Sequence, residues 1–168
     1  MRNFLFFIFA LAAVLGVNGC GYSFGPIGHP QLKTVAVAPV VNETLGYNAA
    51  AQMRGLLTEC FTTDGTVKLV SMREADCIVY ARITDVKITE LNWSDDDELQ
   101  GNEWRCSVKV NYSVIIPGRG KPLISEASAS GSADFISGPD LEGSRLSGMR
   151  QAMFEAAKQI VSGITEAW

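Results

Sequence analysis

Histidine is almost absent from this 168-residue chain, and its scarcity narrows the chemistry that the chain can perform. The one histidine, His29, lies in a stretch rich in glycine and proline with no nucleophile-elbow motif nearby, so Ser–His or Cys–His catalysis has little support. The four cysteines show no Cys-x-x-Cys spacing, which argues against a zinc site. These shortages predict a protein that is not an enzyme and that holds no metal.

The familiar ligand-binding loops are missing as well. The segment Gly118-Arg119-Gly120 has neither the following helix nor the Lys-Ser/Thr pair of a phosphate-binding loop. The acidic run Asp95–Glu98 has neither the alternating spacing nor the glycine of a calcium-binding loop, so a solvated loop is favoured there. We therefore expect no cofactor.

Positive charge is also in short supply. The chain has 14 Lys and Arg residues against 18 Asp and Glu, for a net charge of −4. Nucleic-acid binding needs clustered Lys and Arg to contact phosphates, so a nucleic-acid partner is excluded. Beyond the N-terminal segment no stretch approaches the roughly 18 apolar residues of a membrane-spanning helix.

The N-terminal segment has the layout of a bacterial lipoprotein signal. Arg2 is followed by an uncharged stretch from Phe4 to Val17, which is too short to span a bilayer. The small residue Gly19 precedes a lone cysteine, Cys20. We predict that residues 1–19 are removed and that lipidation of Cys20 anchors the protein to a membrane. Each methylene group of an acyl chain that is buried in the bilayer contributes about 0.8 kcal/mol to the free energy of membrane binding. An ordinary secretory signal beside a chance cysteine is the alternative.

The residues after Cys20 predict the location and the domain layout. In enteric bacteria an Asp directly after the lipidated cysteine retains a lipoprotein in the inner membrane, so Gly21 favours the outer membrane. Residues 20–32 are rich in glycine and proline, which interrupt regular structure, and we expect them to form a tether. Residues 33–168 are expected to form a single domain, long enough to bury a proper core.

The first half of this domain predicts a β-α-β unit. Thr34–Val41 is apolar and β-branched, as strands are. A helix is expected from about Tyr47 to Thr62, because its apolar residues fall on one face. Thr66–Ser71 is the second strand, and a helical crossover makes the two strands parallel.

The second half predicts three longer strands and a final helix. In Cys77–Asn92 the apolar positions change parity near Asp85, which predicts a bulge. Glu103–Ile116 alternates strictly, and Pro122–Phe135 is so rich in serine and alanine that we expect a flat outward surface. Asp140 is the expected N-cap of the last helix. The predicted fold is α+β, with two helices packed on one face of a mixed four- to five-stranded sheet.

Three cysteines follow Cys20, and an odd number cannot all pair within one chain. Cys60 and Cys106 fall on the apolar faces of a predicted helix and a predicted strand. We expect both of them, and Cys77, to be small buried core residues. A single disulfide stays open as an alternative.

With these elements placed, the whole mature chain resembles the lipopolysaccharide-assembly family LptE. The resemblance lies in Cys20–Phe24, in the strand Val35–Ala38, in the strand and turn Asn111–Gly120, and in Arg150–Ala152 and Ala156–Ile160 of the last helix. It implies two helices against a four-stranded sheet and a binding role without catalysis. It further implies a plug inside the outer-membrane barrel LptD, which assists the assembly of that barrel and contacts lipopolysaccharide.

The turn between the two last strands is the predicted contact with partner or lipid. Its residues Pro117, Gly118, Arg119 and Lys121 end a long two-stranded ribbon, and such a tip projects into solvent. Lipopolysaccharide is phosphorylated, so its binding favours Lys and Arg. The other candidate cations are scattered along the sequence: Lys109, Arg145 and Arg150.

Two other functions compete with this interpretation. A lipoprotein adaptor or pilot for another envelope secretion or transport machine would use the same anchor and the same polar sheet. A periplasmic hydrolase would have to use His29.

Overall fold

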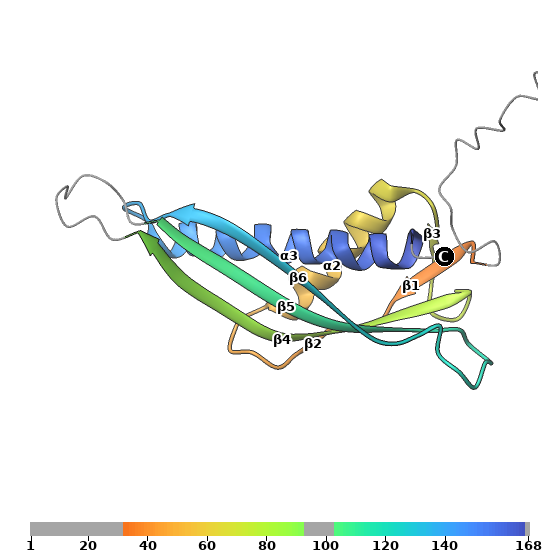
Figure 1. The fold of residues 1–168 in the computed structure, drawn as a ribbon. Coiled ribbons are helices and arrows are strands. Elements are labelled where there is room, and N and C mark those ends of the chain that lie inside the picture. Colours follow the sequence, from red (N-terminus) through yellow and green to blue (C-terminus); the bar gives the residue numbers. More distant parts are fainter. Residues whose placement is uncertain (1–31, 93–102, 167–168) are drawn as a thin grey trace, which may run out of the picture.

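The computed structural model describes residues 32–92 and 103–166 and has an α+β fold, as predicted (Figure 1). The elements follow in the order β1 Thr34–Val37, β2 Val41–Asn42, α2 Ala49–Asp64, β3 Lys68–Leu69, β4 Cys77–Asn92, β5 Glu103–Ile115, β6 Ile124–Ile136 and α3 Leu141–Thr165. His29, the cleavage site at Cys20, most of the predicted tether and the run Asp95–Glu98 lie outside the described residues. Within the described ranges, no helix is long and apolar enough to cross a membrane.

Among the described residues the sheet has six strands, in the order β3-β1-β4-β5-β6, with β2 also paired to β4. The strands β1, β2 and β3 form the parallel part, because β1 pairs in parallel with both β3 and β4. The strands β4, β5 and β6 form the antiparallel part. Figure 1 shows α3 running along these long strands, with α2 beside it on the same side of the sheet. This is the predicted arrangement of helices and mixed sheet.

The first predicted strand, Thr34–Val41, is divided in the structure. β1 ends at Val37 and β2 begins only at Val41, with Pro39 between them. Proline has no N–H to donate to a ladder, so pairing with β4 stops there and resumes further along. The predicted second strand, Thr66–Ser71, shrinks to the two residues of β3 at the sheet edge. The prediction of parallel pairing between these strands is confirmed.

The long strands match their predictions closely. In the β4–β5 pairing the register shifts between Ile83 and Asp85, which confirms the predicted bulge. The bulge returns Val86 and Ile88 to the side of Ile83, where they are partly buried against the core. In β5 every second residue from Cys106 to Val114 is buried, as strict alternation predicts.

The prediction of a flat outward surface on β6 holds for its serines but is wrong for its alanines and glycine. The row Ala127, Ala129, Gly131 and Ala133 faces the helices and is largely covered by them. A Cβ atom at Gly131 would lie 2.0 Å from the backbone oxygen of Ala152 on α3. The row is small because a helix backbone rests on it, and only the serine row lies open to solvent.

Helix α3 begins as the sequence predicts and supplies much of the core. Asp140 caps it, its carboxylate accepting a hydrogen bond from the Gly143 N–H at 2.9 Å. Its buried stripe packs with α2 and the inner face of the sheet into one core. The largest fully buried side chains there include Phe61, Met53, Leu57, Ile83, Met153 and Ile160.

Candidate functional site

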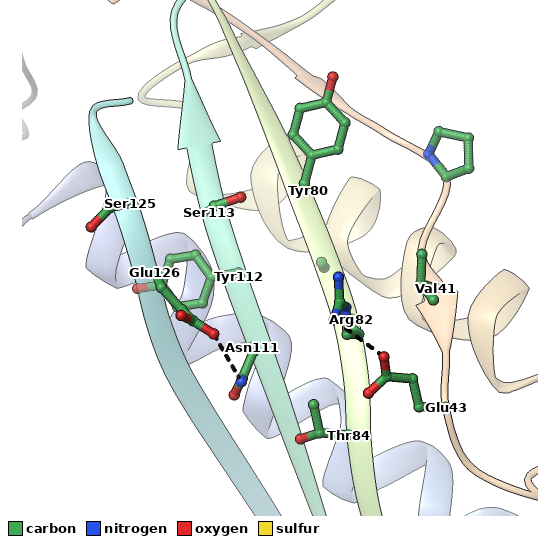
Figure 2. A pocket seen from close by; sticks show the side chains of 12 residues that line it. Val41, Glu43, Tyr80, Arg82, Thr84, Asn111, Tyr112, Ser113, Ser125 and Glu126 are labelled. Carbon is green, nitrogen blue, oxygen red and sulfur yellow. Dashed lines mark hydrogen bonds and ion pairs between the residues drawn. The ribbon is translucent and has the colours of Figure 1, made fainter. Parts of the chain in front are cut away.

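The face of the sheet that the helices leave uncovered, called the open face below, carries a groove over β2, β4, β5 and the start of β6 (Figure 2). Its volume is about 460 Å³, within the range of roughly 300–1,000 Å³ that is common for ligand pockets. The polar positions of the alternating strands line it because the apolar positions of the same strands face the core. The lining residues are Pro39, Val41, Glu43, Tyr80, Ala81, Arg82, Thr84, Asn111, Tyr112, Ser113, Ser125 and Glu126.

Two polar pairs shape this groove, as Figure 2 shows. Arg82 Nη1 lies 3.2 Å from Glu43 Oε1, which joins β4 to the chain just after β2. Both side chains are about half exposed, so this pair adds little stability. Asn111 Nδ2 donates to Glu126 Oε1 at 3.4 Å. Asn111 Oδ1 is shielded from solvent without a partner among the described residues, so an incoming donor would satisfy it.

One wall of the groove is apolar. Tyr80 is 42% exposed and Val41 is 51% exposed, and Pro39 lies beside them. Ser113 and Ser125 also line the groove, but no histidine accompanies them there to act as a general base. In the described ranges no group of three or more His, Cys, Asp or Glu side chains is placed to hold a metal ion. The groove thus combines an apolar wall with two polar pairs.

The predicted contact residues lie in an exposed connection between β5 and β6. Ile116 accepts a hydrogen bond from the Arg119 N–H at 3.1 Å, and Gly118 between them has φ +79°. This is the β-turn that favours glycine at its third position. The tight turn covers residues 116–119. The whole connection extends over residues 116–123 and is therefore longer than the predicted tight hairpin. Pro117, Arg119 and Lys121 are exposed, as predicted.

This turn lies next to the beginning of the described chain. Pro117 and Arg119 line a cavity of about 300 Å³ together with Leu32 and Asp76. The Asp76 carboxylate accepts hydrogen bonds from the N–H groups of Lys33 at 3.0 Å and Thr34 at 2.9 Å. These hydrogen bonds lower the pKa of Asp76, and the bond from the Lys33 N–H has the largest effect. The predicted contact turn is therefore at the end of the domain where the predicted tether enters.

The other candidate cations do not gather around this turn. Lys109 is on the exposed side of β5, whereas Arg145 and Arg150 are on α3. Arg145 Nη1 lies 3.4 Å from Glu142 Oε2 on its own helix. Arg119 and Lys121 are thus the predicted cations that the fold holds in the connection itself.

Residues 32–167 match the model of the LptE family, described as lipopolysaccharide-assembly. This chain belongs to the LptE family. The family acts in lipopolysaccharide assembly and is not enzymatic. No curated protein matches the chain.

Several solved structures share this LptE-family fold at low sequence identity. A hypothetical protein, CT253, from Chlamydia trachomatis is 17% identical with a TM-score of 0.52, over 79% of this chain and 93% of the other. A minor lipoprotein from Acinetobacter baumannii is 10% identical with a TM-score of 0.52, over 80% and 93%. PelC from Paraburkholderia phytofirmans, solved as a dodecamer, is 15% identical with a TM-score of 0.53, over 84% and 94%. At these identities the likeness concerns the fold alone.

Sequence reasoning missed most of the groove in this LptE-family chain. The alternation in β4 placed Tyr80 and Arg82 on the polar side of the strand, which was the available signal. The proximity of Glu43 depends on the pairing of Val41 with Arg82, and no local pattern specifies that register.

The three described cysteines are free thiols in the core of this LptE-family domain, as expected for small apolar residues. Burial raises the pKa of Cys60 and Cys106, and it raises the pKa of Cys77 to about 11. A buried, protonated thiol is a poor nucleophile.

We expect Ellman's reagent at pH 8 to modify Cys60, Cys77 and Cys106 at least about a hundredfold more slowly in the folded chain than in guanidinium, because reaction requires opening of the core. A Ser147→Cys variant, with a thiol at an exposed position of α3, is the control and should react at once. Equal rates for the folded and unfolded chains would contradict the assigned burial.

Proposed function

We propose that this protein is an outer-membrane lipoprotein that plugs the LptD β-barrel and assists its assembly during transport of lipopolysaccharide to the cell surface. Residues 1–19 are the signal, residues 20–32 are the tether, and Cys20 carries the acyl chains on the periplasmic side of the membrane. The observation that carries the proposal is the family match over residues 32–167. The open face supports it, because the lumen of such a barrel is polar and the exposed serines of β6 suit a polar wall.

Capture of the full-length protein from native membranes tests the partner. We expect mass spectrometry to find one large β-barrel protein in stoichiometric amount. Recovery of the monomer alone would contradict the proposal. A Cys20→Ala variant should leave the membrane fraction, and its retention there would contradict lipid anchoring. Depletion of this protein from cells distinguishes the proposed function from the adaptor alternative. Loss of lipopolysaccharide from the cell surface supports the proposed function, whereas loss of a secreted product supports an adaptor.

The turn residues Arg119 and Lys121 provide the contact prediction. Reversing each charge to Glu should weaken binding to immobilised lipopolysaccharide or to the barrel by about two- to fivefold per charge, as an exposed ion pair is worth up to about 1 kcal/mol. Lys68→Glu, a reversal at an exposed position on β3, is the matched control and should change nothing. Unchanged binding in Arg119→Glu would end the contact assignment.

A further inference from the structure

Strand β6 forms one edge of the sheet, and the far side of its backbone has no backbone partner among the described residues. From Ala127 to Ile136 it follows β5 in unbroken antiparallel register. The irregularity in this pairing lies before Ala127, near the connection from β5. The edge is therefore regular over most of its length.

One hydrogen bond shows which residues of β6 point outward. The Ser130 N–H donates to Gln159 Oε1 on α3 at 3.0 Å, so the Ser130 backbone is directed away from β5. Backbone groups of successive strand residues alternate between the two sides. Ser128, Ser132 and Asp134 therefore present their N–H and C=O groups to the same free edge.

This edge has few of the protections that are usual for exposed strands. Natural edges are kept short, bulged, or supplied with lysine or proline, because a bare edge is a template for another strand. Residues 127–136 contain no lysine or proline, and their one charge, Asp134, is bound by Arg105 at 2.6 Å and 2.8 Å. Gln159 is the cover that the described residues supply. The three exposed serines leave the edge sterically open.

A second copy of the chain does not fit on this edge. α3 lies directly against β6, because a Cβ at Gly131 would meet the Ala152 oxygen at 2.0 Å and the Ala156 nitrogen at 2.5 Å. Two copies paired through β6 around Gly131 would place their α3 helices only about 4.8 Å apart there, the spacing of strands. Packed helices need roughly 8–10 Å. The occupant must therefore be a strand that has no helix beneath it.

We propose that the free edge of β6 is a strand-addition site for an extended segment of another protein, which pairs its backbone with Ser128–Asp134. Gln159 guards the site and leaves Ser130 when the segment binds. The segment places its side chains opposite the small, exposed serines of β6. The proposal goes beyond the proposed function, because it names the form of the occupant and does not depend on that occupant being the barrel.

Two substitutions at Ser132 separate the backbone from the side chain. Ser132→Pro removes an N–H that makes no bond within the sheet, and proline is tolerated where the N–H side faces solvent. We therefore expect Ser132→Pro to retain the fold and to block strand addition. Ser132→Ala keeps the N–H and is the matched control. Gln159→Ala removes the guard and keeps the edge, so it should strengthen binding.

Photocrosslinking in cells that make the full-length chain, with a photoreactive residue at Ser128, tests the site. We expect crosslinks to one contiguous segment of one other protein. Their yield should fall at least tenfold with Ser132→Pro, persist with Ser132→Ala and rise with Gln159→Ala. Thermal melting checks the proline variant, and if that variant unfolds the Gln159→Ala result decides.

Three outcomes would overturn the proposal: no protein crosslink at Ser128, a crosslink to a second copy of the chain, or yields that do not respond to Ser132→Pro in a folded protein or to Gln159→Ala. A crosslink to a protein other than the barrel would support the strand-addition site even if membrane capture refuted the proposed function. Capture of the barrel without a crosslink at the edge would support the proposed function and overturn the strand-addition site.

Discussion

Replacing Gly131 with alanine is expected to lower the free energy of unfolding by about 3 kcal/mol or more, which is at the upper end of overpacking effects. The new methyl group would lie 2.0 Å from the Ala152 oxygen and 2.5 Å from the Ala156 nitrogen. Both are backbone atoms of α3, so no rotamer change can relieve the overlap. The helix must lift away from β6, and the core contacts of Met153 and Ile160 loosen with it. Urea denaturation of the full chain measures the loss.

Gly55→Ala is the matched control, because it adds the same methyl group to a different environment. Gly55 is exposed in the middle of α2, and a Cβ there meets nothing within 4 Å. Alanine should stabilise this helix by about 0.5–1 kcal/mol, since glycine loses more backbone freedom on folding. The same glycine-to-alanine change is thus expected to lower the free energy of unfolding at position 131 and to raise it at position 55. A Gly131→Ala loss below about 1 kcal/mol would show that α3 does not rest on β6 as described.

Truncating Phe61 to alanine should cost about 3–5 kcal/mol, the range for deletion of a buried aromatic ring. Phe61 is fully buried in the last turns of α2 and belongs to the single core. Its backbone oxygen also accepts the hydrogen bond from the Gly65 N–H, which fixes the end of the helix and resists collapse around the void. Domains are typically stable by 5–15 kcal/mol, so this loss is a large share of the total.

The expected loss of stability at Phe61 depends on the volume of side chain that is removed. Phe61→Leu keeps most of the apolar contact and should cost clearly less than Phe61→Ala, and Thr62→Ala at the next, exposed position should cost little. Chemical denaturation followed by tryptophan fluorescence gives the three values. Equal losses for Phe61→Ala and Thr62→Ala would contradict the burial of the ring.

The long antiparallel strands and α3 could be predicted from the sequence because their signals are local. Alternation places β5 within one residue of its observed end, and the change of parity near Asp85 locates the bulge. Asp140 marks the start of α3 through its own hydrogen bond. Each of these signals is confined to a few neighbouring residues, so no knowledge of distant pairing was needed.

The rest required long-range pairing. The short extent of β3 is set by the hydrogen bonds from the Lys68 N–H to the Lys33 carbonyl and from the Val70 N–H to the Val35 carbonyl, between segments far apart in sequence. The small residues around Gly131 suggest an open surface until the approach of α3 is known. Distant pairing likewise creates the groove and places the turn at Pro117 beside the start of the domain.

The position of β1 has a mechanical consequence for a chain held at its N-terminus. β1 pairs on both sides with parallel strands, β3 and β4, and Asp76 binds the N–H groups of Lys33 and Thr34 at its entry. A pull on the residues before Leu32 first meets these two bonds. When the pull is directed along β1, it loads the two ladders of this strand in shear, so that several hydrogen bonds share the force. A lipid anchor ahead of this strand would thus hold the domain through hydrogen bonds that must break together under such a pull. They would not break one after another.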